Sequence, residues 1–81
     1  MKRPTARIPL DLGTAPLIEM IGNRSVSVEG STGILLYETT NIKIGTNRMV
    51  LSFEGRGLGV RCVSGSCVEI TGYVTKIEFV S

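Results

Sequence analysis

The chain has 81 residues, of which 42% are hydrophobic and 20% are charged. This length suits one small domain with a thin core, and this composition excludes an intrinsically disordered chain. Histidine is absent, there are two cysteines, and Asp11 is the only aspartate. Because the groups that usually perform acid, base or metal chemistry are scarce, we expect no enzyme, no catalytic or metal site, no cofactor and no small-molecule substrate.

Residues 1–16 contain all three prolines and three basic residues, Lys2, Arg3 and Arg7. They show no helix or strand period, which predicts an N-terminal arm over 1–16, followed by an all-β domain over 17–81. Without this arm the chain is nearly neutral and has no basic stripe, so we expect no nucleic acid as a partner. No secretory signal and no long apolar run are found, which predicts a cytoplasmic protein, with peripheral attachment to a membrane as an option.

From residue 17 onward, short segments of alternating apolar and polar residues are separated by Gly, Asn or Ser. This pattern is typical of strands and turns and leaves little room for a helix. It predicts strands at 17–21, 25–29, 33–39, 41–44, 48–54, 58–63, 67–71 and 73–80. We therefore predict an all-β fold, a small antiparallel meander that forms a sandwich or roll of about 7–8 short strands. A short β-solenoid is the alternative, because the segments recur at a nearly constant spacing.

The alternation also predicts which side chains face the core. The predicted inward set is Val26, Val28, Ile42, Ile44, Met49, Leu51, Phe53, Leu58, Val60, Cys62, Val68, Ile70, Tyr73, Thr75, Ile77 and Phe79. The segment Gly33–Tyr37 is apolar on both faces, so it is either the central strand or part of an interface.

Cys62 and Cys67 suggest a hairpin disulfide or half of a metal site. Two cysteines without histidine cannot complete a tetrahedral zinc shell within one chain. A two-residue turn would pair the two cysteines, whereas a three-residue turn would pair Val60 with Val68 and bury a continuous apolar face. We favour the second register, which leaves both thiols unbridged.

The glycine-rich run Gly55–Gly59 faintly resembles a phosphate-binding loop, but no helix follows whose N-terminus could hold a phosphate. A tight hairpin is the preferred interpretation. Arg56 and Arg61, together with Tyr37 or Tyr73, could form a stacking surface for single-stranded nucleic acid. A small nucleic-acid-binding β barrel is therefore the alternative function.

Several short motifs, in this order, resemble a known family. They are Ile21-Gly22-Asn23, Gly33–Tyr37, Phe53-Glu54-Gly55 and the closing run Ile70–Phe79. Their order and spacing are similar to those of the YabP/YqfC family of small sporulation proteins. The resemblance implies a mother-cell protein of endospore formation, linked to coat or cortex assembly, that works beside a membrane-embedded sporulation partner and has no catalytic residues.

A meander of this size leaves strand edges unpaired, and an unpaired edge is a template for another copy. No proline lies after residue 16, and the β region has only Lys43 and Lys76 as edge-blunting lysines. We predict a homo-oligomer that forms through strand edges. The final segment, Tyr73–Val80, is the expected first contact, and the apolar Ile34–Tyr37 segment is the second.

Overall fold

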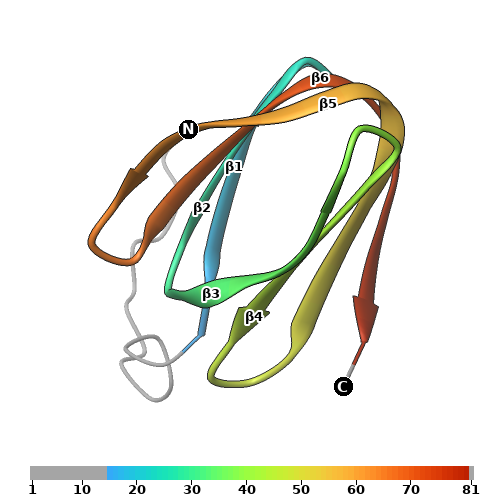
Figure 1. Cartoon of the computed structure of the whole chain (residues 1–81). Helices are drawn as coiled ribbons and strands as arrows, with labels where there is room; N and C mark the ends of the chain where they lie inside the picture. Colours follow the sequence, from blue (N-terminus) through green and yellow to red (C-terminus); the bar gives the residue numbers. More distant parts are fainter. Residues whose placement is uncertain (1–14, 81) are drawn as a thin grey trace, which may run out of the picture.

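The structure is a computed structural model, and it describes residues 15–80. This range forms six strands and no helix: β1 (Leu17–Ile21), β2 (Ser25–Glu29), β3 (Ser31–Glu38), β4 (Asn41–Thr46), β5 (Val50–Ser64) and β6 (Cys67–Val80). They make one antiparallel sheet in the order β1-β2-β6-β5-β4-β3 (Figure 1). The predicted all-β antiparallel class is confirmed, and the solenoid alternative, which requires parallel rungs, is wrong. The predicted arm over 1–16 lies almost entirely outside the described residues.

The two long strands, β5 and β6, bend sharply and fold the sheet over on itself (Figure 1). In the first layer, β1 pairs with β2, and β2 pairs with residues 67–71 of β6, which pair in turn with residues 59–64 of β5. In the second layer, residues 73–80 of β6 pair with residues 50–56 of β5, followed by β4 and β3. The result is a small roll with two layers that share their longest strands.

Glycines allow the bend because the backbones of β5 and β6 approach each other too closely for a side chain. A β-carbon at Gly72 would lie 2.6 Å from the carbonyl oxygen of Gly57, and one at Gly55 would collide with the carbonyl oxygen of Tyr73. Gly72 also has φ +124°, which other residues rarely adopt. The predicted hairpin at Gly55–Gly59 is therefore wrong. These glycines bend a continuous strand, and for this reason eight predicted segments become six strands.

The core lies between the two layers. The first layer contributes residues from β2 and β6, the second contributes residues from β4 and β5, and two residues come from the bend. The buried apolar set is Val26, Val28, Val68, Ile70, Ile42, Ile44, Leu51, Phe53, Leu58 and Val74. Ile18, Met49, Val60 and Ile77 pack against it. The inward-facing prediction for β2, β4 and the first half of β5 is confirmed, because these strands alternate regularly.

Three residues of β6 depart from the predicted inward set: Tyr73, Thr75 and Phe79 are exposed, whereas Val74 is buried. The predicted face of Tyr73 is therefore wrong. Gly72 turns the backbone at this point, and the register shifts between Glu54 and Gly55, so that one extra residue of β6 bulges out before Ile77. Ile77 then faces the core again, as predicted. A strict alternation cannot anticipate such an inserted residue.

Turns fasten the roll at both of its ends. In the turn between β1 and β2, the carbonyls of Asn23 and Arg24 accept hydrogen bonds from the amides of Val74 and Gly72, at 2.9 and 3.3 Å. In the turn between β3 and β4, the carbonyls of Thr39 and Thr40 accept hydrogen bonds from the amides of Leu58 and Gly55 in β5. At the other end of the roll, Ser66 accepts from the amides of Gly30 and Ser31. The bend is thus fixed by backbone contacts from both sides.

The hairpin between β5 and β6 has neither of the registers weighed from the sequence. Its turn is Gly65-Ser66, with Ser64 opposite Cys67, and Gly65 has φ +59°. The predicted pairing of Val60 with Val68 is wrong, because Val60 lies opposite Ile70. A register shift between Val60 and Cys62 inserts one residue into β5, and this bulge returns the apolar residues to one face despite the shorter turn.

Candidate interaction surfaces

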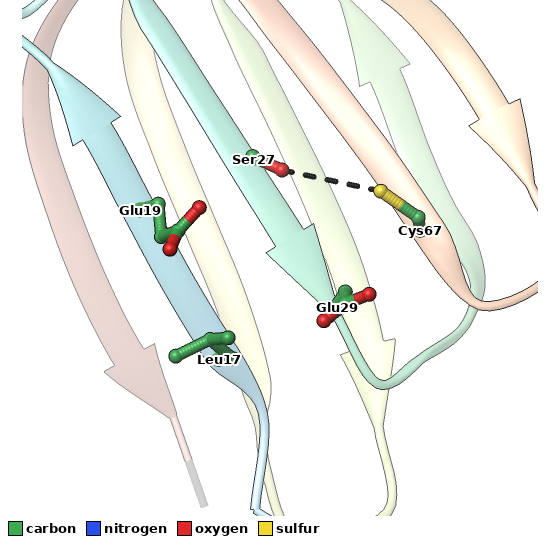
Figure 2. Close-up of a pocket in the computed structure, with 5 residues that line it drawn as sticks. All are labelled: Leu17, Glu19, Ser27, Glu29 and Cys67. Atoms are coloured by element: carbon green, nitrogen blue, oxygen red, sulfur yellow. Dashed lines mark hydrogen bonds between the residues drawn. The ribbon is translucent and has the colours of Figure 1, made fainter.

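The structure places Cys67 on the outer face of the first layer as a free thiol. Figure 2 shows a shallow pocket around Cys67, lined by Leu17, Glu19, Ser27 and Glu29. The Ser27 hydroxyl and the Cys67 sulfur are 3.9 Å apart. No hydrogen bond joins either carboxylate to this hydroxyl or thiol, so the pocket lacks an assembled nucleophile and base.

Metal-binding clusters are also missing from the part of the chain that the structure describes: no three His, Cys, Asp or Glu side chains converge there. None of the described residues forms a helix long and apolar enough to cross a membrane. The features that can make contacts are strand edges and exposed side chains.

The first such feature is the free edge of β6. Residues 76–80 pair in an unbroken register with residues 50–54 of β5, and β2 pairs with β6 only over residues 67–71. The other side of this part of β6 therefore has no strand partner among the described residues, as the sequence predicted for the final segment. Its charged protection is a single exposed ion pair, Lys76 with Glu78, at 3.7 Å. This edge is regular and weakly protected, which favours pairing with another strand.

The end of this edge is apolar. Phe79 is 61% exposed and borders an open apolar groove formed with Ala15, Pro16, Ile18 and Met49. Val80 beside it is 46% exposed. Phe79 belongs both to the free edge and to the groove, so the two features lie side by side.

The outermost strands of the sheet, β1 and β3, also have one free edge each, and β3 pairs with β4 alone. The alternative that Gly33–Tyr37 forms the central strand is wrong, because β3 is the outermost strand of its layer. Leu35 is 61% and Tyr37 is 55% exposed, although the Tyr37 hydroxyl accepts a hydrogen bond from the Val60 amide at 3.1 Å. Two register shifts interrupt β3. Since such irregularities hinder edge pairing, β3 is a poorer template than β6.

The third feature is a basic and aromatic cluster at the bend. The guanidinium carbons of Arg24 and Arg56 lie 5.3 and 5.0 Å from the ring centre of Tyr73. The sequence grouped Arg56 with Tyr73, but it paired them with Arg61 rather than with Arg24. Arg24 and Arg56 are far apart in the chain and meet only because the β1–β2 turn bonds to the bend of β6. No pattern in the sequence predicts that Arg24 and Arg56 lie close to the same ring.

The comparison with protein families identifies the relatives of this fold. The family model described as the YabP family matches residues 14–81, which include all six strands and the bend. Searches of curated proteins and of solved structures found no match. Because the family match covers far more than half of the chain, the protein belongs to the YabP family, and this membership suggests a small sporulation-related protein.

Proposed function

We propose that this protein is a non-enzymatic structural or scaffolding component of endospore formation that acts in coat or cortex assembly. It works in the mother-cell cytoplasm, self-associates through strand edges and docks on a membrane-embedded sporulation partner. Membership in the YabP family supports the proposed role in endospore formation. The observation that carries the self-association is the regular free edge of β6, which ends beside an apolar groove.

Pairing of two β6 edges explains why an apolar groove lies beside them. Two copies related by a two-fold axis would extend the second layer into one continuous antiparallel sheet. Phe79 of each copy would then lose contact with water, and burial of an aromatic side chain contributes about 2–3 kcal/mol. A small domain with a thin core gains stability from such an assembly. Leu35 and Tyr37 on β3 offer a second contact for larger assemblies.

Lysine or proline at Thr75 or Ile77 is predicted to shift the oligomer toward monomer. Ile77 packs against the core, so a change there also tests folding. Thr75 and Phe79 are exposed, and Thr75→Lys combined with Phe79→Lys is the sharper variant. The matched control is Thr39→Lys, an exposed threonine in the β3–β4 turn away from this edge.

Sedimentation velocity over a wide concentration range measures the result. We expect an oligomer for the native chain and for Thr39→Lys, and a dissociation constant at least tenfold higher for the double variant. Thermal unfolding confirms that each variant is folded. A native chain that stays monomeric at several hundred micromolar refutes self-association.

The membrane-embedded partner is proposed from the family resemblance. Its test is a pull-down in detergent from sporulating cells with the native chain and with the Thr75→Lys, Phe79→Lys variant as baits. Recovery of one integral membrane protein by the native chain, confirmed by binding of the two purified proteins, supports the proposal. Failure of the purified pair to bind contradicts this part alone, because self-association is measured separately.

A further inference from the structure

The basic and aromatic cluster at the bend has unused binding capacity. Arg24 and Arg56 approach one ring, that of Tyr73, and neither guanidinium has a carboxylate partner among residues 15–80. Cation–π contacts bring both positive charges to this one ring. Each guanidinium can bind phosphate oxygens in a two-pronged geometry, so the cluster offers two oxyanion contacts at one place on the surface.

The cluster is held in place before any ligand binds. The Arg24 Nε donates to the carbonyl oxygen of Gly72 at 3.2 Å, and the Gly72 amide donates back to the carbonyl of Arg24. Arg56 lies directly opposite Tyr73 in the β5–β6 pairing. The remaining guanidinium nitrogens of Arg24 stay available. Binding an anion here therefore requires little ordering of the backbone.

An exposed apolar side chain lies beside the cluster. Ile21, the last residue of β1, is 76% exposed, and the turn that follows it reaches the bend of β5 and β6 at one end of the roll (Figure 1). Binding of a free phosphate would leave the isoleucine exposed to water. A lipid surface would contact all of these side chains, because it offers phosphates for the arginines, an interfacial zone for tyrosine and hydrocarbon for isoleucine.

We propose that this end of the roll docks on an anionic membrane surface, with Arg24 and Arg56 binding lipid phosphates and Ile21 inserting between the lipids. This docking needs neither self-association nor a protein partner. It orients the protein with the bend toward the membrane, and it leaves the free edge of β6 available for another copy.

The test is flotation of the full chain with vesicles of phosphatidylglycerol and phosphatidylcholine at a ratio of 3:7, in about 100 mM salt. Near an anionic membrane each basic residue contributes about fivefold in binding. We expect Arg24→Gln with Arg56→Gln to lose about 25-fold, and Ile21→Ser to lose several-fold. Lys43→Gln with Arg61→Gln removes the same charge from exposed sites elsewhere, and we expect a clearly smaller loss.

Each alternative has its own outcome. All variants retain the N-terminal arm, so its charges contribute equally to each. If the two double variants lose binding to the same extent, only net charge matters and the proposal fails. Vesicles that do not bind the native chain overturn it as well. Preferential binding of inorganic phosphate or of a single-stranded DNA probe, lost in the Arg24, Arg56 variant, would assign the cluster to a different ligand and refute the membrane proposal.

Discussion

Substitution of Gly72 by alanine should disrupt the bend on which the two layers depend. The φ of +124° is strained for alanine, and its β-carbon would lie 2.6 Å from the Gly57 carbonyl oxygen and 2.9 Å from the Leu58 Cα. Backbone strain of this kind costs about 1–3 kcal/mol, and overpacking adds about 1–3 kcal/mol. We expect a loss of about 2–6 kcal/mol. A chain of this size has a total stability of only about 4–12 kcal/mol.

The matched control is Gly59→Ala. Gly59 lies in β5, opposite Thr71, the residue before Gly72 in β6. It has no positive φ, and a β-carbon there would meet its nearest atoms, in Tyr37 and Thr71, at 3.7 and 3.8 Å. We expect a change of less than about 1 kcal/mol, since alanine also restricts the unfolded chain. Urea unfolding followed by circular dichroism at one protein concentration measures both variants. If Gly72→Ala is as stable as Gly59→Ala, the bend does not depend on the close approach described above.

Three further predictions concern the core, one turn and the thiols. Phe53 is fully buried, so Phe53→Ala should lower the free energy of unfolding in urea by about 3–5 kcal/mol. The control Phe79→Ala changes an exposed residue and should lower it by less than about 1 kcal/mol for the isolated chain. Similar losses in the two variants would contradict the assignment of the core. The Thr46 hydroxyl bonds to three backbone groups of the turn before β5, so Thr46→Val should lower the free energy of unfolding by about 1–3 kcal/mol, and an unchanged value would show that water replaces these bonds. Cys62 and Cys67 should both react with iodoacetamide when freshly lysed protein is denatured without a reductant, and a non-reducing mass two hydrogens light would reveal a bridge instead.

The sequence alone determined the class of the fold and the composition of most of its core. Regular alternation in β2, β4 and the first half of β5 identifies Val26, Val28, Ile42, Leu51 and Phe53 as buried, because a strand with one solvated face has a period of two. The free edge of the final segment was predicted because the last strand of a meander has one neighbour. In the structure β6 lies between β2 and β5, and residues 76–80 lack a second strand partner because β2 pairs only with residues 67–71.

The tertiary structure decided how many strands there are, where they bend and which distant residues meet. Glycine at 55 and 72 is compatible with a turn or with a close approach of two strands, and only the packing of β5 against β6 selects the second. Bulges changed the face of Tyr73 and the partner of Val60. One inserted residue reverses the alternation of inward and outward side chains, and the local sequence pattern does not reveal where such a residue is inserted. The tertiary structure also brings Arg24 and Arg56 together at Tyr73. Backbone hydrogen bonds join the β1–β2 turn to the bend of β6, which is distant in the chain, and so place these side chains side by side.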